Sequence, residues 1–162
     1  MASFDIVCKI DMGELKNAFN LAEKEIDNRY DFKGSGTKLE LGAEEITITA
    51  PDEYKMTAAL DILRTKMCKR GIGINALEAG DIVPTGNRLL KQNLKLKQGI
   101  DKEMGKVINK LVKNSGLKVS SSYMDEKIRI TGKQIDDLQA IWAHLKSHKE
   151  VPLDLAMENM KR

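Results

Sequence analysis

The stretch KIRITGKQIDDLQAIWAHLK (Lys127–Lys146) decides the fold, because it has a counterpart earlier in the same chain. The counterpart is EITITAPDEYKMTAALDILRTK (Glu45–Lys66). Each stretch begins with a short alternating strand, passes through a polar break and ends in a helix with one apolar stripe. The two align without gaps, which places Trp142 opposite Leu60 and predicts that its side chain is buried. We therefore predict that this chain of 162 residues is an internal duplication.

The first half of the chain predicts a strand, a helix, a hairpin and a second helix. Residues 3–10 (SFDIVCKI) alternate between apolar and polar side chains, as a half-buried strand does. Asp11 follows as a helix cap, and residues 37–49 have the pattern of a hairpin. The second helix begins near Asp52 and ends at Gly71, because glycine readily adopts the backbone conformation that closes a helix.

The second half repeats this order. Residues 90–97 (LKQNLKLK) alternate leucines with lysines and form the next predicted strand. A helix follows, then a hairpin over residues 116–131 and a final helix that contains Trp142. The short tail VPLDLAM, residues 151–157, is predicted to be a last strand.

These elements predict an α+β fold of two ferredoxin-like βαββαβ units. In such a unit the helices cover one face of the sheet and leave the other face open. Residues 75–87 (NALEAGDIVPTGN) are predicted to be the linker between the units, because they contain the helix and strand breakers Gly80, Pro84 and Gly86.

Composition excludes several classes of protein. Hydrophobic residues make up 41% of the chain, which is enough for packed cores, and no apolar run approaches the ~18 residues that span a bilayer. The first residues do not have the pattern of a signal peptide. Cys8 and Cys68 fit no metal or redox spacing and are predicted to be packing residues. We expect a cytoplasmic protein.

Positive charge is concentrated in one segment. Between Arg88 and Lys118 the chain holds nine basic residues and two acidic ones, although its formal net charge is only +3. A basic block on a mildly acidic body indicates an anionic partner, whereas a solvated lysine-rich helix is the alternative.

Five segments carry a resemblance to a known family. They are SFDIV, RYDFKG, LDILRTKMCKRGI, LKQGIDKE and IRITGKQIDDLQAI, and in this order they resemble the YajQ family of small bacterial proteins. The resemblance implies a nucleotide-binding protein, with cyclic di-GMP as the ligand of some members. It also implies two ferredoxin-like domains that exchange strands. Residues 11–97 would form one domain, completed by the strand 91–97, and residues 1–10 with 98–162 would form the other.

The strand 91–97 is the first candidate binding site. If its leucines pack on helices, Lys91, Lys95 and Lys97 project from the open face of the sheet. A row of ammonium groups there is stabilised by phosphate through charge-assisted hydrogen bonds. The alternative interpretation is protection of a sheet edge, since lysines on an edge strand prevent aggregation.

Two further groups of cations are candidates. Arg129 and Lys127 alternate with isoleucines, so they also point away from the core. Arginine can form paired bonds to phosphate, whereas an ordinary solvated face is the alternative interpretation. The segment RYDFKGSG supplies Arg29 and Lys33 beside glycines and aromatic rings, although its spacing is not that of a P-loop. Phe32 in this segment is also consistent with an ordinary core residue.

Motifs for catalysis are absent from the sequence. His144 and His148 are four residues apart, but a zinc site needs further ligands. We therefore predict a non-enzymatic nucleotide-binding protein without a cofactor, a receptor for cyclic di-GMP or a related nucleotide that acts through a regulatory protein such as a transcription factor. The alternative is an RNA-binding protein that uses its open sheet faces, although its outward strand positions lack aromatic residues for stacking.

Overall fold

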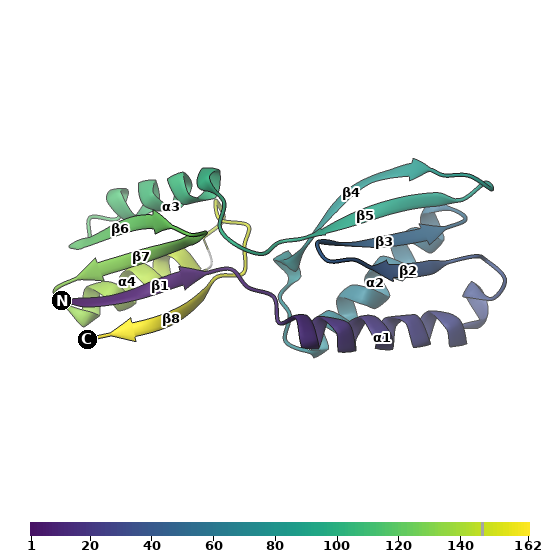
Figure 1. Ribbon diagram of the computed structural model, residues 1–162, viewed down its shortest axis with the longest axis horizontal. Coiled ribbons are helices and arrows are strands. Elements are labelled where there is room, and N and C mark those ends of the chain that lie inside the picture. Colours follow the sequence, from purple (N-terminus) through teal and green to yellow (C-terminus); the bar gives the residue numbers. More distant parts are fainter. Residues whose placement is uncertain (147) are drawn as a thin grey trace. The chain divides into compact units, whose positions relative to one another are not determined.

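The computed structural model describes residues 1–146 and 148–162. The chain divides into two compact units (Figure 1). The N-terminal unit is Ile10–Lys97, and the C-terminal unit combines Met1–Lys9 with Gln98–Arg162.

The N-terminal unit contains a four-stranded antiparallel sheet and two long helices. Its strands follow the order β2-β3-β5-β4 across the sheet. In chain order its elements are α1 (Met12–Asn28), the short helix η1 (Tyr30–Phe32), β2 (Lys38–Leu41), β3 (Glu45–Ala50), α2 (Glu53–Lys69), the short helix η2 (Ile74–Ala76), β4 (Leu77–Pro84) and β5 (Leu90–Leu96).

Aspartate side chains cap the first turns of α1 and α2, as the sequence predicts. The Asp11 carboxylate accepts a hydrogen bond from the backbone N–H of Glu14 at 3.1 Å, and Asp52 accepts one from Lys55 at 2.7 Å. Each bond satisfies a backbone donor that has no partner within the helix. At the other end of α2, Gly71 takes a φ of 82°, which favours glycine.

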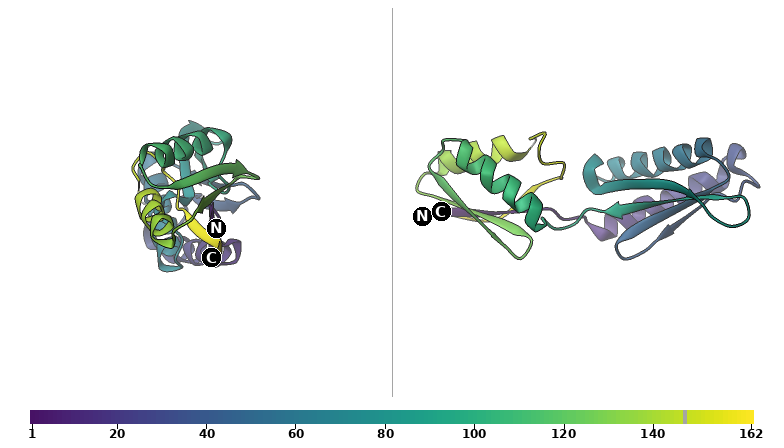
Figure 2. Two further views of the ribbon diagram at one scale, coloured as in Figure 1. Left: turned by 90° about the vertical axis from the view of Figure 1, so that its left-hand side faces the viewer. Right: turned by 90° about the horizontal axis from the view of Figure 1, so that it is seen from above.

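The core of the N-terminal unit lies between its helices and one face of the sheet (Figure 2). Leu15 from α1 and Met56 from α2 are fully buried there with Ile46, Ile48 and Leu94 from the strands. The alternation of buried and exposed residues along β5 leaves the lysines on the opposite face. That face carries polar side chains and is open.

The prediction of a linker over residues 75–87 is wrong. Most of this segment forms β4, which pairs with β5 along the edge of the sheet. Its breakers are accommodated by the edge position: the register shifts between Ala79 and Ile82, and Pro84 is the last residue of the strand. The bulge also satisfies the buried Gln92, whose side-chain amide donates to the Gly80 carbonyl at 2.8 Å.

The C-terminal unit has the same architecture. Its strands follow the order β6-β7-β1-β8, all antiparallel. In chain order its elements are β1 (Ala2–Val7), α3 (Lys102–Asn114), β6 (Val119–Met124), β7 (Lys127–Gly132), α4 (Ile135–Lys146) and β8 (Ala156–Lys161).

The two sheets exchange their first strands. β1 begins the chain, yet it lies between β7 and β8 in the sheet of the C-terminal unit. β5 occupies the matching place in the N-terminal unit, between β3 and β4. The α+β class with two ferredoxin-like units is therefore confirmed, and the strand membership is the one that the resemblance implies.

Three details differ from the sequence predictions. Trp142 is half-buried rather than buried: its ring meets Phe4 edge-on at 6.1 Å, while part of the ring remains accessible. Cys8 is buried, but Cys68 is exposed because it lies on the outward side of α2, next to the inward Met67. The last strand, β8, begins five residues later than expected, after Val151 has joined the core.

Phe4→Ala tests the role of β1 in the C-terminal unit. The Phe4 side chain is fully buried, so its removal should lower the free energy of unfolding by about 3–5 kcal/mol. Because Trp142 is the single tryptophan and contacts Phe4, its native fluorescence should also shift. Tyr54→Ala is the control, since Tyr54 is exposed and should change stability by less than about 0.5 kcal/mol. Unchanged stability and fluorescence in Phe4→Ala would contradict the placement of β1.

Candidate functional site

The open face of the N-terminal sheet carries the lysine row that the sequence predicts. Lys91 and Lys95 are exposed on β5, whereas Leu94 between them is buried on the helix side. β5 pairs with β3 on one side and with β4 on the other, so it is not an edge strand. Protection of an edge therefore does not explain its lysines, and that alternative interpretation is wrong.

The three predicted lysines have different surroundings. Lys95 lies directly opposite Glu45 on β3 and Glu78 on β4, so two carboxylates share its part of the face. Lys97 follows the end of β5, is half-buried and donates its backbone N–H to the Ala76 carbonyl at 2.9 Å. Lys91 instead lies opposite Thr49 and Val83. No acidic residue therefore lies directly opposite Lys91 in either strand pairing, in contrast to Lys95.

A hollow of about 290 Å³ opens beside Lys91. Thr49 lies between Lys91 and Lys38, because both lysines are directly opposite it on the flanking strands. The Lys38 ammonium also pairs with Glu40 at 3.0 Å. The hollow is lined by Lys38, Glu40, Thr47, Thr49, Thr85, Gly86, Asn87, Leu89 and Lys91. It therefore combines two cations and one carboxylate with hydroxyl and amide groups and one apolar side chain.

The loop between β4 and β5 forms one wall of this hollow. Its ends are joined by a hydrogen bond from the Thr85 N–H to the Leu89 carbonyl at 2.9 Å. Asn87 and Arg88 at its tip have φ values of 62° and 61°, a conformation that is uncommon outside glycine. This wall could not be predicted from the sequence, because the glycines and proline of residues 75–87 have the pattern of a linker.

Arg129, the main candidate in the C-terminal unit, is bound to a carboxylate. Its Nε donates to Asp5 Oδ1 at 2.9 Å and its Nη2 to Asp5 Oδ2 at 3.4 Å. Asn159 donates a third bond to the same carboxylate at 3.0 Å, and Asp5 is only 4% exposed. Arg129 is thus the partner of a buried acid from β1, and the side of the guanidinium that faces Asp5 cannot bind phosphate.

The Asp5–Arg129 pair changes the acidity of both groups. The pKa of Asp5 lies below its ordinary value of 3.8, chiefly because Arg129 hydrogen-bonds its carboxylate, although burial opposes the shift and Asn159 assists it. The pKa of Arg129 is raised by the same hydrogen bond. Asp5 was not predicted from the sequence, where it is one acid within an apolar strand.

Lys127 is paired as well. Its ammonium group lies 3.5 Å from Glu158 on β8, and the same carboxylate lies 3.1 Å from Lys9. Lys127 and Arg129 share a small cavity of about 120 Å³ with Asp5, Met124 and Asp125. Acidic groups therefore balance the cations on this open face.

The cations of RYDFKGSG do not join the hollow. Arg29 forms two bonds to Asp31, at 2.9 and 3.0 Å, and lies over the ring of Phe32. The hydrogen bond raises the pKa of Arg29 and lowers that of Asp31. Phe32 is 4% exposed and belongs to the core, so the interpretation of Phe32 as an ordinary core residue is confirmed. Lys33 is exposed beyond the short helix η1.

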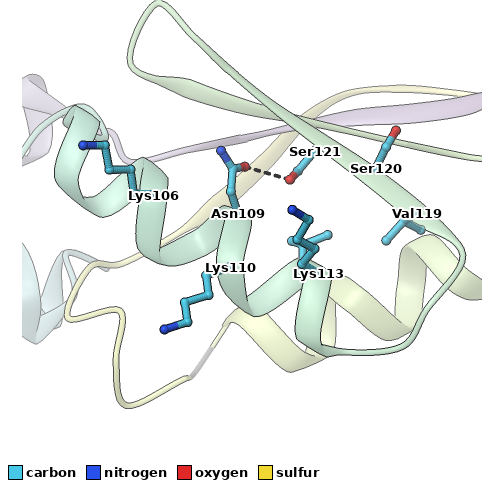
Figure 3. Close-up of a pocket in the computed structure, with 8 residues that line it drawn as sticks. Lys106, Asn109, Lys110, Lys113, Val119, Ser120 and Ser121 are labelled. Atoms are coloured by element: carbon cyan, nitrogen blue, oxygen red, sulfur yellow. Dashed lines mark hydrogen bonds between the residues drawn. The ribbon is translucent and has the colours of Figure 1, made fainter.

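The largest of the described cavities lies elsewhere, between α3 and β6 (Figure 3). It measures about 640 Å³, and we call it the α3–β6 groove. Ser121 Oγ donates to Asn109 Oδ1 across it at 2.7 Å. The groove is lined by Lys106, Asn109, Lys110, Val112, Lys113, Val119, Ser120 and Ser121.

The lysines of this groove belong to the basic block but were missing from the predicted site. Lys106, Lys110 and Lys113 are spaced four and three residues apart, which places them on one side of a helix. Figure 3 shows them projecting from successive turns of α3. That spacing was visible in the sequence, and so was the strand β6 within the predicted hairpin, but the sequence did not show that the strand lies beside these lysines.

Other functional classes receive no structural support from the described residues. Within residues 1–146 and 148–162, no group of three or more His, Cys, Asp or Glu side chains is placed to hold a metal ion. His144 and His148 instead stack edge-on, with 5.2 Å between ring centres. Among the helices described, none is both long and apolar enough to cross a membrane.

Asp5→Asn tests the buried pair through its pH dependence. A carboxyl whose pKa is lowered by folding stabilises the fold above its unfolded pKa and loses this contribution as pH falls through the folded pKa. Asp5→Asn should therefore be less stable than the parent at neutral pH, and the difference should shrink below about pH 3.8. Denaturant unfolding measured across this range checks the prediction. A difference that does not change with pH would show that the Asp5 charge is not the cause.

Comparisons with known proteins give the family. The sequence model described as "Nucleotide-binding protein YajQ-like" matches residues 2–161. A nucleotide-binding protein of Geotalea daltonii is 43% identical over 162 residues, which cover 100% of both chains. Nucleotide-binding proteins of Syntrophotalea carbinolica and Bdellovibrio bacteriovorus are 44% and 45% identical over 161 residues, which cover 99% of each chain. The resemblance noted in the sequence is thus a relationship along the whole length, and the chain belongs to the YajQ family.

Proposed function

We propose that this protein binds a nucleotide on the open face of its N-terminal sheet, without catalysis. The observation that carries the proposal is the pair of lysines, Lys38 and Lys91, on either side of Thr49 beside a hollow. The printed names of the relatives, which are nucleotide-binding proteins, support the ligand class.

The two lysines suit a phosphate group. β2 and β5 flank β3, so the backbones that carry Lys38 and Lys91 are about 10 Å apart. Long flexible side chains can close that distance around an anion, and the hydroxyl of Thr49 lies between their attachment points. Charge-assisted hydrogen bonds to phosphate are stronger than bonds between neutral groups. β5 is a central strand, so Lys91 does not serve to protect a sheet edge. Phosphate binding would explain why a lysine stands at this outward position.

The rest of the hollow suits the sugar and the base. Thr47, Thr85 and Asn87 supply hydrogen-bonding groups, and Leu89 offers an apolar surface for a ring. The volume of about 290 Å³ lies just below the range for small-molecule sites, roughly 300–1,000 Å³. One nucleotide therefore fills it. The second half of a cyclic dinucleotide would extend over the open sheet toward Lys95.

Cyclic di-GMP is the first ligand to test, and its binding would act through a regulatory protein partner. RNA is the competing ligand, since open four-stranded sheets bind single strands through aromatic side chains. The outward strand positions described in the two sheets carry no aromatic ring, so stacking does not favour RNA.

The test is calorimetric titration of Lys38→Gln/Lys91→Gln with cyclic di-GMP, GTP, ATP and a short RNA. Each charged hydrogen bond contributes about 1.5–3 kcal/mol, so its loss should weaken nucleotide binding about tenfold or more. Measurement at two salt concentrations separates the ligands, because RNA binding depends more steeply on salt than binding of a small dinucleotide.

The matched control is Lys110→Gln/Lys113→Gln, which removes the same charge from the α3–β6 groove. This variant should bind the nucleotide as the parent does. If the control loses nucleotide binding and the sheet variant keeps it, the nucleotide lies in the groove and the proposed site is wrong.

A further inference from the structure

β6 is an edge strand with an open side. It pairs with β7 on one side only, because the sheet order is β6-β7-β1-β8. The β6–β7 turn has two residues, Asp125 and Glu126, both at positive φ, as in a tight hairpin. Met124 and Lys127 are therefore a hydrogen-bonded pair, and the backbone groups of Ser121 and Tyr123 point toward the open edge.

The other three edges carry features that discourage strand addition. β2 has four residues, one of them Lys38. β4 is bulged and ends in Pro84. β8 has a register shift and ends in Lys161. Short length, bulges, proline and lysine all block the pairing of further strands.

β6 carries none of these features. Its six residues, VSSSYM, contain no proline, glycine or charge, and its register with β7 is unbroken. An edge of this kind accepts an extended chain, because its free N–H and C=O groups can form a ladder with a new strand. The α3–β6 groove runs beside this edge.

The groove adds a charge requirement for such a strand. Lys106, Lys110 and Lys113 follow one side of α3 at about 5.4 Å per turn, which is shorter than the roughly 7 Å between same-side residues of an extended chain, and their long flexible side chains can span the difference. The lining contains no acidic residue; the nearest carboxylate recorded on α3 is that of Glu103, 3.9 Å from the Lys106 ammonium. Val112 and Val119 supply the apolar part of the lining.

We propose that the α3–β6 groove binds an extended acidic segment of a partner protein, which adds to β6 as a fifth strand. Alternate acidic side chains of the segment face the three lysines, and its backbone pairs with the open edge. This inference does not depend on the nucleotide proposal, since it concerns another cavity and another unit of the chain.

Two other kinds of occupant would match only one of the two features of the groove, the lysine charge and the open edge of β6. A phosphate ligand would neutralise the lysines, but it would leave the edge of β6 without strand partners. A second copy of the chain, paired β6 to β6, would bring two lysine rows together on the same sheet face. An acidic strand meets both requirements.

The experiment uses the full chain and synthetic peptides of eight residues that alternate Glu with Val. Binding is followed by the fluorescence anisotropy of a labelled peptide, and hydrogen exchange reports on the amides of β6. The acidic peptide should bind and protect these amides. A Lys-Val peptide should not bind, and Lys110→Gln/Lys113→Gln should weaken binding of the acidic peptide at least tenfold.

The decisive control modifies the peptide rather than the protein. Methylation of alternate backbone nitrogens, in both possible phases, keeps the charges but removes the donors that a strand needs. Alternate N–H groups of a strand point to opposite sides, so only one set would face β6. Methylation of that set should weaken binding at least tenfold, whereas methylation of the other set should not. Equal binding of all methylated peptides would show attraction by charge alone and overturn strand addition. The proposal would also be overturned if the acidic peptide did not bind up to its solubility limit. It would be overturned as well if a nucleotide displaced the peptide from the groove.

Discussion

Both sheets depend on a strand that comes from the other half of the sequence. A sheet that lost its third strand would expose backbone donors and acceptors on both neighbours, and buried polar groups of this kind are costly. β1 pairs with β7 over five residue pairs and also with β8, so the first residues of the chain hold the last strand in place. The same strand carries Phe4 into the core and Asp5 to the opposite face. Packing and charge pairing in the C-terminal unit therefore both follow from the position of β1.

The position of β5 has a comparable consequence for the N-terminal unit. A central strand with alternating leucine and lysine must bury one set of side chains and present the other on the sheet face. Because the neighbouring strands are fixed by backbone pairing, each lysine acquires defined neighbours: Lys95 faces two glutamates, and Lys91 faces Thr49. Register thus distinguishes two lysines that look equivalent in sequence.

Local patterns predicted most of the fold, and long-range pairing explains what they missed. The period of apolar residues located the four helices, and the caps Asp11 and Asp52 were recognisable because they act within three residues. β4 was mistaken for a linker because an edge strand tolerates the glycine and proline that a central strand excludes. Asp5 and Arg129 are 124 positions apart, and no local pattern links them. The hollow beside Lys91 was also hidden, since it combines three strands and a loop. The internal duplication remains a prediction from the sequence repeat.

The exchange of strands also divides the basic segment from Arg88 to Lys118. The boundary between the two units falls after Lys97, so one run of cations in the sequence supplies two different surfaces. The first surface is a sheet face, where lysines alternate with buried leucines and hydroxyl groups lie between the strands. The second is a helix beside an open strand edge, that of β6. A cluster of positive charge in the sequence predicts an anionic partner, and the surface that each lysine can offer to such a partner depends on the unit to which it belongs.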